Sequence, residues 1–399
     1  MEFLYHNDSY MREFDAVVTE VSQREEGFAV TLSRSAFYYT SGGQPHDTGT
    51  LGGAKVLDVF KEGEKILHIV DSPLKEGDAV RGEIDWQRRF DHMCQHAGEH
   101  MIAWAIRQKF GGTTIGLHLG AQVSTIDVDM HGAPMKLSPQ DISDIENMVM
   151  EKILANLPID CWFPSPEELE TLPLRKKPTV NENVRVVGIG GFEYVACGGT
   201  HPRSTGEIGM VKIVDARPNR GKLRVSFFCG MRAFRAFQLL QRQADEACAL
   251  LSASWENLSE NVSLALERQR QAEGELLALQ IRSLLSREEE LLSKARLCAE
   301  GRAVFASFDM AGEEAIRALA SKLAEQGDVI ALVFSKEEGK ISAVLARGGD
   351  IPVHMGNLLR EVFSGHGGKG GGRPEFAMGS LPQDADMDAL RAGLMAALS

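Results

Sequence analysis

The segment Gln95–Trp104, with the sequence QHAGEHMIAW, predicts a helix that carries two histidines on one side. Ala97 favours the helix, and Met101 contributes to an apolar side. His96 and His100 are four residues apart, so on a helix their Cβ atoms lie about 5–6 Å from each other. Two imidazoles in this arrangement can share one metal ion and supply half of a tetrahedral zinc site.

The best candidate for the other half lies about a hundred residues later, in Cys197-Gly-Gly-Thr-His201. This segment offers one thiolate and one imidazole, and its glycines allow the backbone to wrap around a metal. Two ligands from each of two segments are typical of zinc. The alternative is that Cys197 is a small buried residue and that His201 belongs to a turn before Pro202.

Two neighbours of the histidine pair leave the assignment open. His92 extends the pair into an i, i+4, i+8 stripe, whose outer members lie about 12 Å apart and cannot share one ion. Spacing alone does not select two of the three, and His92 could face solvent or act as a base beside the site. In addition, HAGEH matches the HxxEH pattern of zinc peptidases, in which Glu99 would be the general base. A cysteine ligand would be unusual for that chemistry.

Composition limits the class of protein. The chain has 399 residues, enough for two or three domains, and a net charge of −13. That charge argues against general nucleic-acid binding, so any such affinity must come from a locally shaped site. Six widely spaced cysteines indicate a reducing, cytoplasmic environment. No apolar run approaches 18 residues and the polar start lacks a signal core, so we expect neither a membrane span nor a secretion signal.

The pattern changes several times along the chain. Short alternating runs between Glu13 and Glu83 predict a small β-barrel. Ser138 is a plausible N-cap for a helix that continues to about Ala155. From about Met231 to Ala299 the sequence predicts continuous helix, either one long helix or a helical hairpin. The last hundred residues predict a separate α/β domain.

Two glycine-rich segments allow a structural or a functional interpretation. Thr40–Gly49 is either a hairpin turn or a loop whose backbone amides and Gln44 contact a polar ligand. In the run 365–372, Gly370 follows Lys369 where a P-loop requires serine or threonine, so that motif is excluded. This second run is either a disordered linker or a backbone-lined site for phosphate or RNA.

Three segments taken in order, FYYTSGGQPHDTG (37–49), QHAGEH (95–100) and CGGTH (197–201), resemble the editing domain of alanyl-tRNA synthetases and the free-standing editing proteins of the AlaX type. Further on, GGKGGGRPEFAMG (367–379) resembles the glycine-rich signature of the DHH-associated domain that ends these synthetases. The resemblance therefore covers nearly the whole chain and is closest to the long form of AlaX.

This resemblance implies an α+β multidomain fold. Its parts are a translation-protein-like β-barrel (1–86), an α/β editing domain with a zinc-binding helix (87–232), a long helical or coiled-coil linker (233–300) and a C-terminal glycine-rich α/β domain (301–399).

The resemblance also implies site residues. The ligands of one Zn²⁺ per chain are His96, His100, Cys197 and His201, which leaves His92 outside the ligand set. Gln44 and His118 are the candidate catalytic residues. The substrate-binding candidates are Ser35, Ser41, Gly42, Gly43 and Gln44, although relatives often carry threonine near position 35. Lys369 and Arg373 are candidates for tRNA binding.

The implied activity is hydrolysis, in trans, of tRNA(Ala) charged with serine or glycine. A synthetic pocket for alanine discriminates against such small differences only about 10–200-fold, so a second site must remove the errors. Only about a dozen residues precede the editing part, so we expect no aminoacylation. We expect the C-terminal half to bind tRNA or to form a homodimer.

Four protein ligands leave no open position on a tetrahedral zinc ion. We therefore expect the metal to bind the substrate amino group or to order the pocket. The alternatives are a noncatalytic, zinc-stabilised tRNA-binding protein and the zinc peptidase.

Overall fold

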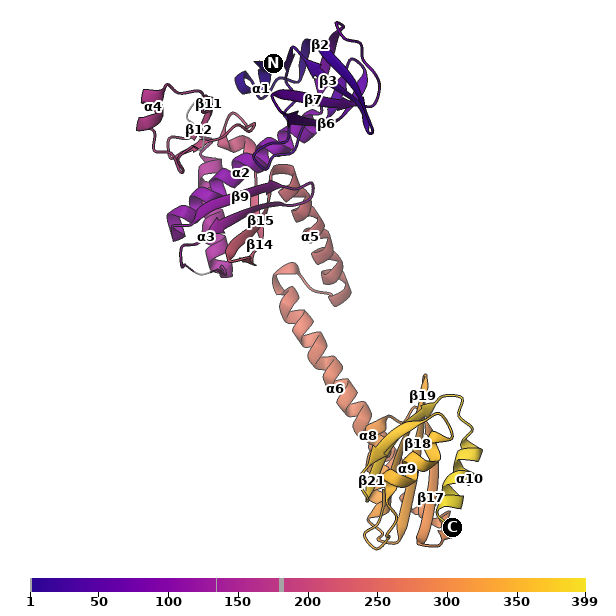
Figure 1. Ribbon diagram of the computed structural model, residues 1–399. Coiled ribbons are helices and arrows are strands. Elements are labelled where there is room, and N and C mark those ends of the chain that lie inside the picture. Colours follow the sequence, from indigo (N-terminus) through magenta and orange to yellow (C-terminus); the bar gives the residue numbers. More distant parts are fainter. Residues whose placement is uncertain (1, 134, 179–182) are drawn as a thin grey trace. The chain divides into compact units, whose positions relative to one another are not determined.

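The computed structural model describes residues 2–133, 135–178 and 183–399. The chain forms two compact units, Met1–Gln243 and Ala244–Ser399 (Figure 1). Each unit combines helices with β-sheets, so the predicted mixed, multidomain architecture is confirmed. Within the described ranges, none of the helices combines the length and the apolar character needed to cross a bilayer.

The first unit begins with a closed barrel whose neighbouring strands are antiparallel. In order around the barrel the strands are β2 (Glu13–Arg24), β3 (Gly27–Leu32), β7 (Lys65–Val70), β6 (Ala54–Glu62), β5 (Gly49–Leu51) and β8 (Ala79–Ile84). Buried and exposed residues alternate in β8 and in the first half of β2, because successive side chains of a strand point to opposite faces. Val30, Leu51 and Val56 are fully buried in the barrel core.

Helix α2 (Trp86–Phe110) follows the barrel and passes through the interior of the first unit (Figure 1). The side chain of Asp85 caps its first turn by accepting a hydrogen bond from the Arg88 backbone, and Gly111 ends it in the left-handed conformation. Every residue from 92 to 106 is buried. The polar side chains of the histidine segment therefore need partners inside the protein.

A four-stranded antiparallel sheet packs beside α2. Its order is β14 (Val211–Asn219), β15 (Lys222–Cys229), β10 (Ser124–Asp129) and β9 (Thr113–Leu119). Helix α3 (Pro139–Leu154) contributes to the same core. The predicted cap at Ser138 is confirmed, because its hydroxyl accepts from the Asp141 backbone and forms a capping box.

A smaller antiparallel sheet and several short elements complete this unit. The sheet contains β11 (Ile159–Trp162), β12 (Val186–Ile189) and β13 (Glu193–Ala196). The short elements are β1 (Glu2–Phe3), α1 (Leu4–Asn7), β4 (Arg34–Ser35), α4 (Pro166–Thr171) and the 3₁₀ turn η1 (Thr205–Ile208). The segments after β4, β11 and β13 contribute residues to the metal cluster and to the pocket described below.

Of the two forms predicted for Met231–Ala299, the single long helix is wrong, and the helical region also ends earlier than predicted. Helix α5 (Gly230–Leu251) ends where Ser252 takes a φ of 50°, and a capping box between Ser254 and Asn257 starts a new turn, η2 (Trp255–Asn257). The chain continues as α6 (Leu258–Leu285), α7 (Glu288–Ser293) and the strand β16 (Arg296–Cys298). Serine and asparagine side chains that bond to nearby backbone amides compete with the helix and end it here.

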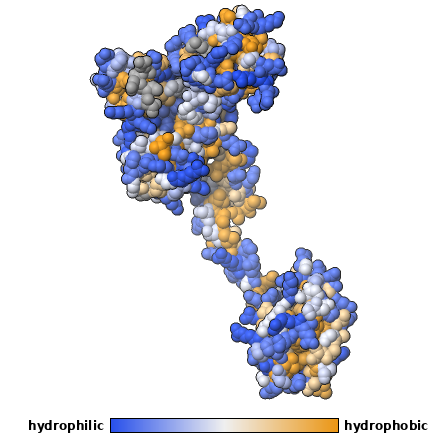
Figure 2. Space-filling model, in the orientation of Figure 1, coloured by the Kyte–Doolittle hydropathy of each residue, from blue (hydrophilic) through white to orange (hydrophobic). Residues whose placement is uncertain are grey.

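Helix α5 carries an exposed apolar face, which is visible as orange surface over this helix in Figure 2. Its exposed apolar side chains within the first unit are Met231, Phe234, Phe237, Leu239 and Leu240.

The second unit is built on one six-stranded sheet. Its order is β16, β17 (Gly301–Asp309), β18 (Val329–Glu337), β19 (Lys340–Arg347), β21 (Phe376–Pro382) and β20 (Lys369–Gly372). Helix α8 (Glu313–Ala324) covers one face, and α9 (Met355–Ser364) and α10 (Met387–Ala397) cover the other. Alternate residues of β18 belong to the two opposite cores, so this strand is apolar along most of its length.

The second glycine-rich run is not a disordered linker, because Lys369–Gly372 forms the edge strand β20. Its glycines allow close packing. A Cβ atom on Gly372 would lie 2.2 Å from the Phe376 carbonyl oxygen, and one on Gly356 of α9 would lie 2.4 Å from the Gly372 carbonyl oxygen. The alternative interpretation, a site for phosphate or RNA, remains a prediction.

Candidate metal centre

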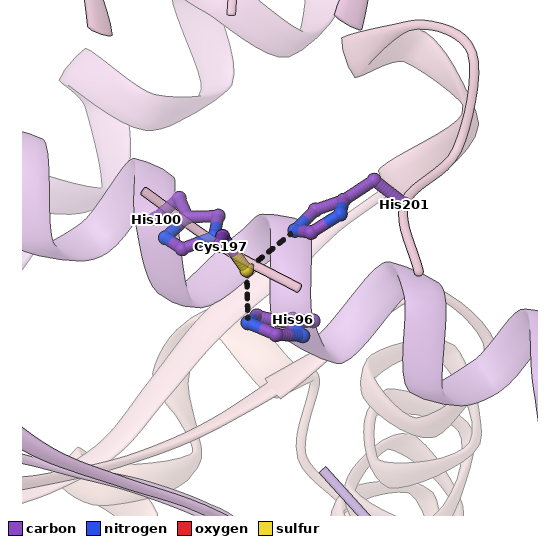
Figure 3. A group of neighbouring side chains, drawn as sticks. All are labelled: His96, His100, Cys197 and His201. Atoms are coloured by element: carbon purple, nitrogen blue, oxygen red, sulfur yellow. Dashed lines mark hydrogen bonds between the residues drawn. The ribbon is translucent and has the colours of Figure 1, made fainter. Parts of the chain in front are cut away.

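The two predicted halves of the metal site meet in the first unit. His96 and His100 project from α2, and Cys197 and His201 come from the segment after β13 (Figure 3). One potential ligand atom from each of the four lies within 4.8 Å of the others. The cluster could therefore hold a metal ion.

Two separations between the sulfur and the imidazole nitrogens are close to those expected around a tetrahedral ion. The Cys197 sulfur lies 3.4 Å from the Nε2 atom of His96 and 3.8 Å from that of His201. With Zn–S near 2.3 Å and Zn–N near 2.0–2.1 Å, two such ligands stand roughly 3.5 Å apart. The observed distances bracket this value.

Each histidine is fixed through its other ring nitrogen, Nδ1. In His96 this atom lies 2.9 Å from the Gln44 side-chain oxygen, and in His201 it lies 3.1 Å from the Gly199 carbonyl oxygen. In His100 it lies 2.8 Å from a carboxylate oxygen of Glu99, while the buried Nε2 has no partner among the described residues. All three Nε2 atoms are thus directed to the centre, the arrangement in which an outer hydrogen bond sets the tautomer of a metal-binding histidine.

Cys197 is suited to bind a metal as a thiolate. Burial alone raises the pKa of a thiol, but the imidazoles of His96 and His201 outweigh this effect and hold the pKa of Cys197 well below its usual range. The backbone around the sulfur is also fixed. Arg185 donates to the carbonyl oxygens of Cys197 and Gly199 at 3.1 and 2.7 Å.

Gln44 contacts the ligand histidine from behind. Its side chain is fully buried, and its amide nitrogen donates to the Thr200 hydroxyl at 2.9 Å. Its oxygen accepts from the Thr200 backbone at 3.3 Å as well as from His96. Every polar atom of the amide is thereby engaged in positioning His96 and the CGGTH segment, an arrangement that the GGQ motif alone does not reveal.

Glu99 is engaged with its neighbours in a buried charge network. Burial raises the pKa of Glu99, but Arg175 and His100 outweigh it and lower the pKa to about 2. Arg175 lies 3.7 Å from Glu99 and 3.4 Å from Glu193, which also binds Arg107 at 2.8 Å. Arg175 and His100 therefore keep the Glu99 carboxylate ionised.

A pocket with a volume of about 580 Å³ opens onto the cluster. Of the predicted substrate-binding residues, Ser41 and Gly42 line it. Gly43 packs against β9, where a Cβ atom would lie 2.2 Å from the Leu117 carbonyl oxygen. Tyr38 and Tyr39 of the first motif also line the pocket. Further aromatic and basic side chains in its lining lie outside the motifs, because they come from segments far apart in the sequence.

Three further candidates do not line this pocket. Ser35 is buried in the first unit, where its hydroxyl lies 2.8 Å from the His68 Nε2 atom. His118 is exposed on β9, where the pocket lining ends at the preceding residue, Leu117. His92 is buried and lies outside the ligand cluster, so the expectation that it could face solvent is wrong.

Lys369 and Arg373, the candidates for tRNA binding, are exposed side chains of the second unit. Their role stays a prediction.

Three family models match the chain. They are described as "tRNA synthetases class II (A)" over residues 5–88, "Threonyl and Alanyl tRNA synthetase second additional domain" over 184–226, and "DHHA1 domain" over 301–399. A solved structure, the C-Ala domain from Aquifex aeolicus alanyl-tRNA synthetase, matches 27% of this chain and 98% of its own, at 24% identity and a TM-score of 0.26.

Similar proteins span nearly the whole chain. The alanine–tRNA ligase of Pyrobaculum arsenaticum is 33% identical over 98% of this chain, and that of Pyrococcus furiosus is 32% identical over 95%. This chain spans only 44% and 42% of the lengths of these ligases. The alanyl-tRNA editing protein AlaX-L of Pyrococcus horikoshii is 28% identical over 96% of this chain and 95% of its own length. The resemblance indicated by the motifs is thereby confirmed: the chain is a relative of the long AlaX-type editing proteins and of the matching part of alanyl-tRNA synthetases.

Proposed function

We propose that this protein is an aminoacyl-tRNA hydrolase that removes serine, and also glycine, from mischarged tRNA(Ala). The observation that carries the proposal is the cluster of one cysteine and three histidines, each held through its Nδ1 atom, beside a pocket that three of the four residues line. The similarity to AlaX-L over 95% of that protein's length supports the same activity. The substrate is then the ester that joins an amino acid to the 3′ end of the tRNA.

We propose zinc as the metal, held by His96, His100, Cys197 and His201. Imidazole and thiolate are the donors that zinc prefers in proteins. The unpartnered Nε2 atom of His100 supports this assignment, since a buried polar nitrogen without a partner is costly unless something occupies the space before it. When bound, zinc can polarise an ester carbonyl or lower the pKa of a water molecule.

The residues of the chain itself would then position and enclose the substrate. Gln44 and Glu99 hold His96 and His100 in fixed orientations, and Arg185 holds the backbone beside Cys197. Ser41 and Gly42 line the pocket and are the candidates for contact with the amino acid. Because Gln44 is fully engaged, we assign it a positioning role in place of direct contact with the serine hydroxyl.

The test is incubation of the purified protein with Ser-tRNA(Ala) and, separately, with Ala-tRNA(Ala). We expect rapid loss of serine and little loss of alanine, measured as acid-precipitable radiolabelled amino acid. If neither ester is hydrolysed although the tRNA binds, the protein is a noncatalytic tRNA-binding protein instead.

The peptidase interpretation requires Glu99 to act as the general base. In this structure its carboxylate contacts His100 and Arg175, the behaviour of a residue that orients a metal ligand. We expect no cleavage of casein or short peptides by the wild-type protein, measured by release of free amino groups. Peptide cleavage that disappears in Glu99→Gln would support the peptidase over the proposed function.

A further inference from the structure

Five aromatic side chains line the pocket above the metal cluster, and we refer to Tyr5, His6, Tyr38, Tyr39 and Phe163 as the aromatic wall. They come from three separate segments: α1, the loop after β4 and the loop after β11. Their rings form a connected series. Centroid distances are 5.9 Å from Tyr39 to Tyr38, 5.3 Å from Tyr38 to Tyr5, 4.7 Å from Tyr5 to His6 and 5.5 Å from His6 to Phe163.

The aromatic wall runs from the interior to solvent. Tyr5 and Tyr38 are buried, His6 and Tyr39 are half-buried, and Phe163 is 47% exposed. Burial and the nearby Arg185 lower the pKa of His6 to about 4, so its ring is uncharged at neutral pH. The outer part of the wall therefore offers uncharged ring surface to a ligand.

Another exposed apolar side chain lines the same pocket. Ile115 of β9 is 51% exposed. Apolar side chains that stay in water and line one cavity indicate a binding surface.

Charge in the pocket is opposite to that of the chain. Four cationic side chains, Arg175, Lys176, Lys177 and Arg185, line it together with one carboxylate, that of Glu99. The whole chain has a net charge of −13. Arg175 and Arg185 are engaged in the contacts described above, whereas Lys176 and Lys177 are exposed and form no ion pair with any residue in the described ranges.

On the proposed function, the unpaired 3′-terminal nucleotides of the tRNA enter this pocket together with the ester. We propose that one of their bases stacks on the aromatic wall, with Phe163 as the outermost ring, while Lys176 and Lys177 contact the phosphates. This inference rests on the proposed function and names the side chains that hold the nucleotides. Flat aromatic rings beside cations are the elements with which proteins bind single strands. In a duplex the faces of each base are covered by the neighbouring base pairs, so only unpaired nucleotides can stack on a protein ring in this way.

Such a site reads shape more than base identity, because every base has a stacking face. The site would hold the 3′ end of the tRNA while the ester reaches the metal cluster. It should therefore contribute to substrate binding and leave the chemical step largely to the residues around the cluster.

The first test compares Phe163→Ala with wild type on Ser-tRNA(Ala). Loss of one stacking ring should raise KM by about 5- to 150-fold and leave kcat within about twofold. Phe163→Tyr should restore the wild-type KM. Leu154→Ala is the matched control, because Leu154 is an apolar residue that is 78% exposed and lies outside the pocket. An unchanged KM, or a fall in kcat alone, would overturn the inference.

The second test does not depend on hydrolysis. Uncharged tRNA(Ala) carrying 2-aminopurine as its 3′-terminal base should lose fluorescence on binding the wild-type protein, and this quenching should be absent with Phe163→Ala. Equal quenching by both proteins contradicts stacking on Phe163. If the wild type quenches the probe but hydrolyses no Ser-tRNA(Ala), the proposed function fails while the stacking site stands.

Discussion

At the metal cluster, onto which the inner end of the pocket opens, His96, His100 and His201 are each anchored through Nδ1, and the groups that anchor them are themselves buried or held by further hydrogen bonds. At the outer end, Phe163 keeps 47% of its surface in water and lies edge-on to His6. One end consists of directional hydrogen bonds with fixed partners. The other consists of apolar ring surface that many flat ligands could share.

The difference shows how one pocket can combine precision with tolerance. Metal ligation requires donor atoms within a few tenths of an ångström of their positions, so the inner end needs a second layer of hydrogen bonds. Stacking has no such requirement, because dispersion and apolar burial vary gradually with geometry. Substitutions at the inner end should therefore remove function, whereas those at the outer end should weaken binding.

The largest effect should come from removing the thiolate. In Cys197→Ala we expect the bound zinc to fall from about one per chain to near zero, because the proposed site consists of only four ligands and loses its thiolate. Deacylation of Ser-tRNA(Ala) should be lost with it. Metal content by atomic absorption and single-turnover hydrolysis check both expectations.

Cys298→Ala is the control for this change, since Cys298 is a half-buried free cysteine of the second unit. It should keep its zinc and its activity. Full hydrolysis by a metal-free Cys197→Ala protein would contradict a role for zinc.

Replacing a residue that holds a ligand histidine should reduce metal binding less than replacing a ligand itself. In Gln44→Ala we expect metal affinity to fall by about 10- to 100-fold, because His96 loses the acceptor that fixes its ring. Competition with a chromogenic chelator measures this affinity. Gln87→Ala, at an exposed position of α2, should bind zinc like the wild type. If Gln44→Ala keeps its metal affinity and loses only discrimination between serine and alanine, Gln44 contacts the substrate after all.

The third prediction concerns a histidine away from the cluster. His68 donates from Nδ1 to the Val30 carbonyl oxygen and accepts from Ser35, and burial lowers its pKa to about 4. In the unfolded chain the His68 side chain has a pKa near 6.5 and therefore binds a proton more readily than in the folded protein. The contribution of His68 to the free energy of unfolding is therefore present above pH 6.5 and is lost as the pH falls toward 4. Between pH 7 and pH 5 we expect a loss of about 2 kcal/mol from this group.

Urea unfolding at the two pH values tests the expectation. In His68→Gln the loss between pH 7 and pH 5 should be smaller by about this amount, whatever the stability of the variant at pH 7. Equal losses in the two proteins would show that other groups cause the acid sensitivity.

The smallest effect should come from the exposed cations of the second unit. If Lys369 contacts a phosphate, Lys369→Ala should weaken tRNA binding several-fold at low salt and reduce the slope of log affinity against log salt by about one. Filter binding over a salt series measures the slope, and Lys340→Ala, on an exposed part of β19, is the control. An unchanged slope would place tRNA binding elsewhere on the protein.

Several elements could be predicted because their causes are local. Ser138 caps a helix through its own neighbour Asp141, and His96 and His100 share a helix face through spacing alone. Local patterns did not predict the helix break at Ser252, because the residues between Met231 and Ala299 have high helix propensity. The capping side chains there end the helix although no proline or glycine marks the position.

The sequence by itself indicated that a histidine helix and the CGGTH segment could each supply half of a metal site, since residue type and spacing carry that information, and the family resemblance then selected His96 and His100 over His92. Only the tertiary structure decided that Gln44 holds His96, that Ser35 pairs with His68 away from the pocket, and that Lys369–Gly372 is an edge strand. It also assembled the aromatic wall from residues as far apart as Tyr5 and Phe163. The physical reason is that these arrangements depend on hydrogen bonds and ring packing between segments remote in the chain, and their partners become neighbours only when the cores form.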